Sequence, residues 1–128
     1  MKRLKLVLII LLVFAVVFAA GIWIFAGQLT KELNEKVQIQ EVDLSKVDDG
    51  VYKETYMYNE GMGATVVVTV IDHKFDTIVI QEHKTGMGKK AEAIVDRVID
   101  QQSLQVDAIS GATGSSKIIL KAIEMAVN

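Results

Sequence analysis

The segment Asp107–Ser116 near the C-terminus combines residue types that can bind a phosphate. It contains Gly111, other small side chains, and the hydroxyl groups of Thr113, Ser115 and Ser116. Apolar residues recur directly after it at the spacing of one buried helix face, which predicts a helix. The unpaired N–H groups and partial positive charge of a helix N-terminus stabilise an anion. We therefore expect a phosphate site here, with Ser115 or Ser116 as the N-cap of the helix.

An ordinary capped turn is the alternative that this chemistry leaves open. The order Asp-x-x-Ser-Gly-Ala-Thr-x-Ser-Ser, however, resembles the flavinylation motif of the FMN-binding domain family. That family includes flavoprotein subunits of the sodium-pumping NADH:quinone reductase and of Rnf complexes. The resemblance implies that Thr113 carries FMN through a phosphoester bond. It also implies that the rest of the motif binds the cofactor, namely Asp107, Ser110, Gly111, Ala112, Ser115 and Ser116.

The resemblance further implies a separate flavin transferase, which in the family uses FAD and a divalent metal. A free threonine is a poor nucleophile, and no base lies beside Thr113 in the sequence. Three roles remain open for Asp107, which are orienting the Thr113 hydroxyl, binding metal during transfer, and capping the turn. Gly114 occupies a variable position of the motif. We assign no catalytic residue and no resident metal site to the chain.

A second glycine-containing loop, residues 82–88, follows a predicted strand and precedes a predicted helix. Its glycines let the backbone approach a planar ring, so we expect cofactor contacts from His83, Thr85, Gly86, Met87 and Gly88. The family has a comparable segment of His, an acidic residue, Thr, Pro and Gly. This chain has Lys84 in place of the acidic residue and lacks the proline. An ordinary connection with a surface histidine is the alternative.

Composition excludes several classes of function. The chain has 14 basic and 16 acidic residues, and its formal net charge is −2. An acidic chain without a basic stripe argues against nucleic acid as a partner. The absence of cysteine excludes disulfides and an iron–sulfur cluster held by the usual thiolates. Any electron transfer must therefore use an organic cofactor.

Residues 6–26 form a hydrophobic run that, as a helix, is about 30 Å long and spans a bilayer. Trp23 near its end suits the membrane interface, and Lys2, Arg3 and Lys5 favour a cytoplasmic N-terminus. A cleaved signal peptide is the alternative, but the length of the run favours an uncleaved anchor. We predict a single-pass protein of the cell membrane whose C-terminal domain is extracytoplasmic.

Three segments with strand-like composition follow the turn signal Asp48-Asp-Gly50. They cover residues 51–58, 65–71 and 75–83, and the short turns between them predict an antiparallel meander. In the first strand, Tyr52, Tyr56 and Tyr58 share one face, suited to sheet packing or to stacking on a flavin. Strict alternation in the third strand puts one set of residues opposite another. The first set is Phe75, Thr77, Val79 and Gln81, and the second is Asp76, Ile78, Ile80 and Glu82.

Two amphipathic helices are expected after the strands, one from about Ala91 to Gln102 and one after the motif. Both can cover one face of the sheet, which predicts an α+β domain behind an N-terminal transmembrane helix. The predicted boundaries are residues 1–27 for the anchor, 28–48 for a stalk or linker, and 49–128 for the FMN-binding domain. Residues 28–36 are expected to continue the membrane helix, and residues 37–44 to be extended.

Together these features predict a membrane-anchored flavoprotein that carries electrons through covalent FMN. Its expected partners are the flavin transferase, membrane redox proteins and the lipid bilayer. We expect a carrier or subunit rather than a stand-alone enzyme. A tethered module that binds a phosphate ligand without redox chemistry, or that serves assembly, is the alternative.

Overall fold

The computed structural model describes residues 1–85 and 88–128, which form two compact units. The first unit, Met1–Glu32, consists mostly of helix α1 (Lys2–Lys36). Among the described residues, α1 is the one helix long and apolar enough to span a membrane. Its large apolar side chains are exposed, which fits the predicted membrane anchor. The expected continuation of this helix through residues 28–36 is confirmed.

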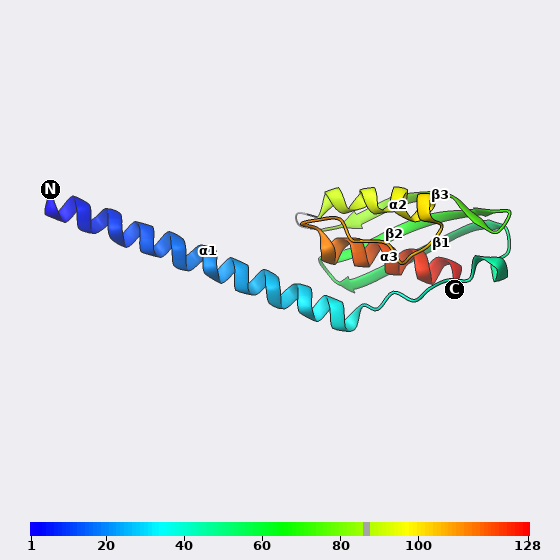
Figure 1. Cartoon of the computed structure of the whole chain (residues 1–128), viewed down its shortest axis with the longest axis horizontal. Helices are drawn as coiled ribbons and strands as arrows, with labels where there is room; N and C mark the ends of the chain where they lie inside the picture. The colour runs from blue at the N-terminus through cyan, green and yellow to red at the C-terminus, as the bar shows by residue number, and fades with distance from the viewer. Residues whose placement is uncertain (86–87) are drawn as a thin grey trace. The chain divides into compact units, whose positions relative to one another are not determined.

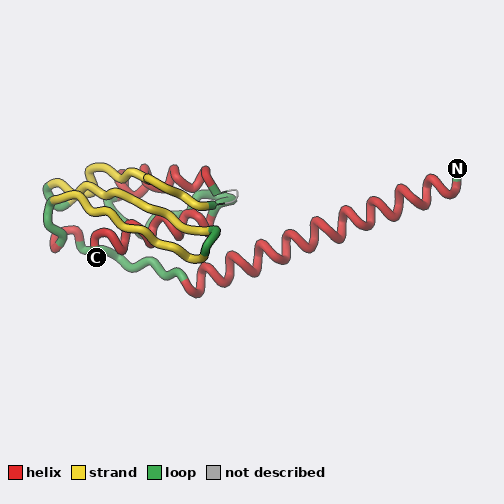
Figure 2. Tube along the Cα trace, turned by 180° about the vertical axis from the view of Figure 1, so that it is seen from behind, coloured by secondary structure: helices red, strands yellow, loops and turns green. Residues whose placement is uncertain are grey.

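The second unit, Leu33–Asn128, is the predicted α+β domain (Figure 1). Its antiparallel sheet has the order β1–β2–β3, formed by β1 (Gly50–Asn59), β2 (Met62–Ile71) and β3 (Lys74–Lys84). The 3₁₀ helices are η1 (Leu44–Lys46) and η2 (Lys89–Ala93), and the α-helices of the unit are α2 (Ile94–Gln101) and α3 (Thr113–Val127). Helix α3 packs on β1 and β2, and α2 packs on β3. Seen from behind, the strands lie in front of both helices (Figure 2).

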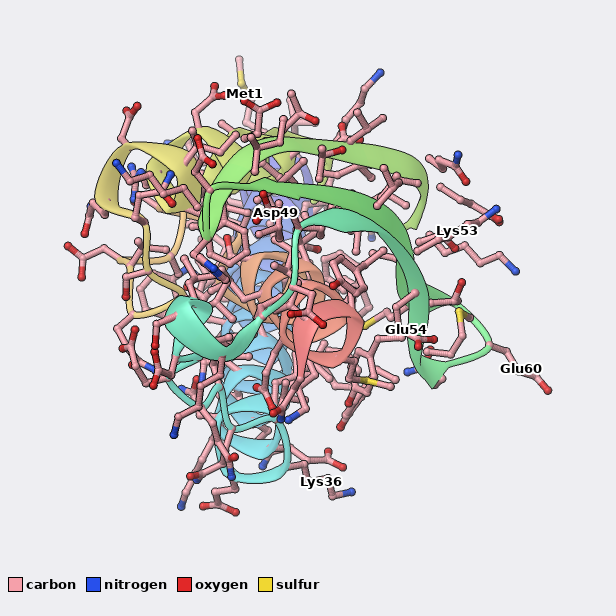
Figure 3. The ribbon with its side chains drawn as sticks, turned by 90° about the vertical axis from the view of Figure 1, so that its right-hand side faces the viewer. Met1, Lys36, Asp49, Lys53, Glu54 and Glu60 are labelled. Carbon is pink, nitrogen blue, oxygen red and sulfur yellow. The ribbon has the colours of Figure 1, made fainter. Side chains whose placement is uncertain are left out.

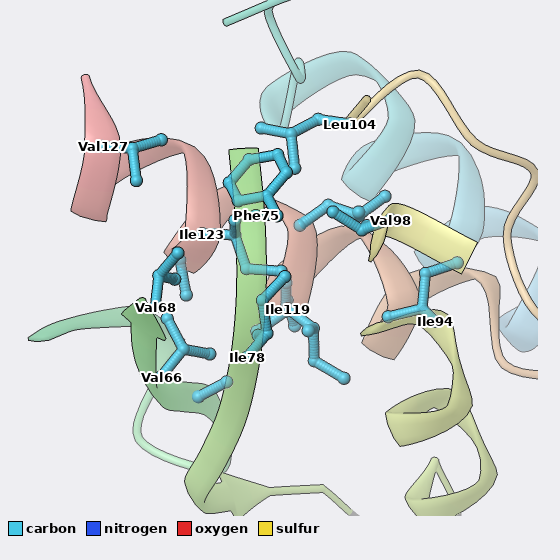
Figure 4. Packing of buried hydrophobic residues seen from close by; sticks show 14 of the residues in the cluster. Val66, Val68, Phe75, Ile78, Ile94, Val98, Leu104, Ile119, Ile123 and Val127 are labelled. Carbon is cyan, nitrogen blue, oxygen red and sulfur yellow. The ribbon is translucent and has the colours of Figure 1, made fainter. Parts of the chain in front are cut away.

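The hydrophobic core lies between the sheet and these two helices (Figure 4). Strand β2 is its centre because alternate side chains are buried, namely Ala64, Val66, Val68 and Val70. Each buried valine or isoleucine side chain contributes about 1.5–3 kcal/mol. The tyrosines of β1 pack against this core, which agrees with the packing interpretation. Lys53 lies between them and points away from α3 (Figure 3).

The turn between β2 and β3 consists of Asp72 and His73, which have φ angles of 52° and 57°. Positive φ at both positions characterises the two-residue hairpin turn whose twist matches that of the strands. The Asp49 carboxylate accepts hydrogen bonds from both backbone N–H groups, at 2.9 Å from Asp72 and 3.1 Å from His73. These bonds, the one from His73 first, lower the pKa of Asp49 below its ordinary value. His73 thus belongs to the structure of the turn.

Two β-bulges in β3 change which of its side chains face the core. The unmatched residues are Asp76 and Gln81. Because of the first bulge, Phe75 and Ile78 are both buried, so the strict alternation predicted for this strand was wrong. The second bulge reverses the alternation again, so that His83 pairs with the buried Ala64 of β2.

Residues 37–41 connect α1 to the domain and are here called the strap. The strap forms no strand within the described residues. Its backbone bonds instead to side chains of α3: the Glu124 carboxylate accepts from Gln40 N–H at 3.0 Å, and Lys121 Nζ donates to the Gln38 carbonyl at 3.1 Å. Val37 is buried, as is Leu33 in the last turn of α1. The segment predicted as a stalk or linker therefore includes side chains that pack within the second unit, Leu33–Asn128.

Candidate functional site

Helix α3 begins at Thr113, and its N-cap is Ala112. The expectation of Ser115 or Ser116 as N-cap was therefore wrong, because the N-cap lies three to four residues earlier in the chain. Within the described residues no side chain caps this end. The N–H groups of the first helical turn have no acceptor within the helix, so they remain available to an external anion.

The hydroxyl groups of the first turn of α3 differ in what they contact. Ser116 is fully buried, and its Oγ donates to the Ala112 carbonyl at 2.8 Å and accepts from Ile109 N–H at 3.0 Å. Ser115 is also buried, and its Oγ lies 3.0 Å from Thr85 Oγ1. Thr113 is half-buried, and its hydroxyl has no hydrogen bond to any described residue. Among the described residues, the Ser116 hydroxyl thus stabilises the turn, the Ser115 hydroxyl contacts the loop after β3, and the Thr113 hydroxyl has no partner.

Gly111 shapes the turn before the helix. Its φ angle is 77°, a conformation that residues with a Cβ rarely adopt. A Cβ built on this glycine would lie 2.5 Å from Lys90 Nζ of η2. Arg97 of α2 donates through Nη1 to the carbonyls of Asp107 and Ala108, at 2.8 and 3.3 Å. Two cations from the preceding helical segment therefore lie along the motif.

The loop after β3 meets the first turn of α3, so the structure brings together parts of both predicted groups. Thr85 Oγ1 accepts from Gly88 N–H at 3.0 Å while contacting Ser115 Oγ. A Cβ on Gly88 would overlap the Ser115 side chain. Glycine is therefore required at position 88 for close packing of the loop on the helix. Gly86 and Met87 lie outside the described residues.

His83 faces the core side of β3 because of the bulge at Gln81. Both of its ring nitrogens are buried, and neither has a hydrogen-bond partner within the part of the chain that the structure describes. Burial lowers the pKa of His83, and the nearby Glu92 carboxylate partly opposes this shift. A shallow pocket of about 340 Å³ is lined by His83, Thr85, Lys89 and Glu92. The alternative interpretation of His83 as a surface histidine does not fit this environment.

Gly114, which the motif leaves variable, contacts a residue far away in the sequence. A Cβ at this position would lie 2.6 Å from Cδ1 of Leu33, which is 2% exposed. The end of α1 thus packs directly on the first turn of α3. The spacing of Leu29 and Leu33 on one helix face was the signal in the sequence, but nothing in it identified α3 as the contact.

The remaining motif residues differ in their exposure to solvent. Asp107 and Ser110 are exposed, and Ala112 is buried. Among the described residues there is no group of three or more His, Cys, Asp or Glu side chains that could hold a metal ion. The turn nevertheless fits a phosphate. It offers the N–H groups of the first turn of α3, close backbone approach at Gly111, the nearby ammonium group of Lys90, and the Thr113 hydroxyl, which has no partner among the described residues.

Comparison with known protein families identifies the family of the part of the chain that holds this site. The model of the FMN-binding domain matches residues 32–128, which include the end of α1, the strap and the whole domain. No curated protein matches the chain. The matched region has the motif, the free Thr113 hydroxyl and the turn suited to phosphate in a single compact unit. Since the match covers most of the sequence, the chain belongs to the FMN-binding domain family.

Proposed function

We propose that this chain is a membrane-anchored, extracytoplasmic flavoprotein that carries electrons through an FMN joined to Thr113 by a phosphoester bond. The observation that carries the proposal is the state of the hydroxyl groups at the start of α3. Within the described residues, the hydroxyls of Ser115 and Ser116 are hydrogen-bonded to Thr85 and to the turn, and that of Thr113 has no hydrogen bond. Membership of the FMN-binding domain family supports flavin as the ligand.

Attachment would require FAD and a separate flavin transferase. In this step the Thr113 hydroxyl oxygen bonds to the phosphorus of the FMN half, and the bond from that phosphorus to the AMP half breaks. The hydroxyl proton passes to a base of the transferase, AMP leaves, and no electrons are transferred. The residues of this chain supply the position: Gly111 and the buried Ser116 fix the turn that presents Thr113.

A carrier role fits the other features of the chain. Bound FMN would supply one- and two-electron chemistry, which the side chains of a cysteine-free protein lack. Helix α1 would keep the domain at the bilayer, next to membrane redox proteins. Covalent attachment would prevent loss of the cofactor outside the cytoplasm. The donor and the acceptor of the electrons would be such membrane proteins.

Mass spectrometry of the intact protein tests the proposal directly. Wild type co-expressed with a flavin transferase should gain the mass of one FMN less one water and fluoresce on a denaturing gel. Thr113→Ala should lose both signals. Thr77→Ala is the matched control, because this threonine is exposed on β3, far from the motif in sequence, and should stay fully modified. Unmodified wild type beside an active transferase would refute covalent attachment and favour a phosphate-ligand or assembly module.

A further inference from the structure

Lys90 occupies a special position among the lysines of the domain. It belongs to η2, yet its Nζ lies 2.5 Å from the place where a Cβ of Gly111 would be, and its Cε lies 3.3 Å from that place. The lysine therefore lies directly over the motif glycine, in space that a side chain at position 111 would fill. Lys89, its neighbour in the same element, instead lines the pocket beside His83.

The ammonium group of Lys90 has no hydrogen bond or ion pair with any described residue. Arg97, the other cation beside the motif, already donates to two carbonyls of the loop. Lys90 is thus a cation beside the motif that no described residue pairs with, so its charge can pair with a ligand.

The acceptor threonine is close to this charge. Two peptide units separate Gly111 from Thr113, so their Cα atoms are at most about 7.6 Å apart. Between them lies the uncapped N-terminus of α3, whose N–H groups favour an anion. The family match independently identifies a phosphate-bearing ligand for this domain.

We infer that Lys90 is a positioning residue for flavin attachment, and that its ammonium group pairs with the phosphate that becomes bonded to Thr113. The inference rests on the proposed function. During transfer, Lys90 neutralises charge on the phosphate of FAD as the Thr113 oxygen approaches. After transfer, it pairs with the single negative charge of the phosphodiester. Lysine acts here as a point charge, so arginine should replace it in part.

The test compares initial rates of flavin transfer to the purified full-length chain in detergent, with FAD and a flavin transferase. Lys90→Gln should lower kcat/KM for the acceptor protein by about tenfold, as expected for loss of a charge-assisted hydrogen bond. Lys53→Gln is the matched control and should react like wild type, because this exposed lysine of β1 points away from α3 (Figure 3). Lys90→Arg should recover most of the rate.

Three further measurements separate positioning from a structural role. The melting temperature of unmodified Lys90→Gln should equal that of wild type, because the side chain is exposed. The final extent of modification should also be unchanged, since only the rate depends on the charge. High salt should reduce the difference between wild type and Lys90→Gln, because the pair is exposed to solvent.

Equal rates for wild type and Lys90→Gln would overturn the role of Lys90 and leave covalent attachment intact. Equal losses in Lys53→Gln and Lys90→Gln would also overturn it, since the change in net charge would then explain the effect. A wild type that is never modified, beside a transferase that is active on another acceptor, would refute the proposed function itself. In that case the inference fails with it.

Discussion

Replacing Leu33 by alanine should destabilise the domain, although this residue lies in the segment that the sequence assigns to a stalk. Its side chain is 2% exposed, and its Cδ1 lies 2.6 Å from the place of a Cβ on Gly114. The contact joins the end of α1 to the first turn of α3, beside Thr113. A double-mutant cycle of Leu33→Ala and Gly114→Ala isolates it.

The size of the effects follows from burial. A buried leucine replaced by alanine costs about 2–5 kcal/mol, because it leaves a cavity. In a domain of this size about 1 kcal/mol lowers Tm by roughly 4–8 °C, so Leu33→Ala should lower Tm by about 8 °C or more. Gly114→Ala alone presses a methyl group against Leu33 and should cost about 1–3 kcal/mol. In the double variant this methyl group occupies vacated space, so the coupling should be about 0.5–3 kcal/mol.

The cycle is measured by urea unfolding of the full-length chain in detergent, followed by near-ultraviolet circular dichroism of the β1 tyrosines. Leu29→Ala, one helical turn earlier and outside the unit Leu33–Asn128, is the control and should change the stability of that unit little. Two results would refute the reasoning. One is additivity of the two changes within about 0.5 kcal/mol, and the other is a Leu33→Ala effect no larger than that of Leu29→Ala.

Two further predictions concern pH and topology. Burial keeps the pKa of His83 below its ordinary value of 6.5. Below that pH, His83 therefore binds a proton more readily in the unfolded chain than in the folded chain. The free energy of unfolding should then fall as pH decreases from 7 to 5. Urea unfolding at several pH values should show a weaker decline in His83→Phe but not in His73→Gln, and identical slopes would contradict this explanation. For topology, Glu60→Cys adds a single thiol at the exposed β1–β2 turn of a cysteine-free chain. A membrane-impermeant maleimide should label it in intact cells and should not label Leu4→Cys, and the reverse pattern would place the domain in the cytoplasm.

Hydrophobic patterning was sufficient to predict the elements of the domain. The three strands, their antiparallel order and the two covering helices occur where periodicity indicated them. These signals are local, since each depends on side chains a few residues apart. The family motif was likewise readable as a contiguous segment, and the domain match confirms the family.

Features that depend on contacts between distant residues were not predictable in this way. The bulges at Asp76 and Gln81 have no signal in the alternation of β3, yet they decide that Phe75 and His83 face inward. The predicted start of α3 was too late in the chain, because serine is a common N-cap residue and the prediction assigned that role to Ser115 or Ser116. Their hydroxyls instead bond to partners that only the folded chain brings near.

The strap has a mechanical consequence. Side chains of α3 bond to its backbone at Val37, Gln38 and Gln40, with N···O distances between 3.0 and 3.4 Å. Tension along the chain from a membrane anchor would therefore act on these hydrogen bonds before it reached the strands. The first element of the domain to receive this force would be the helix that begins at Thr113. Lateral drag on such an anchor would thus be borne by the same helix that presents the proposed acceptor hydroxyl.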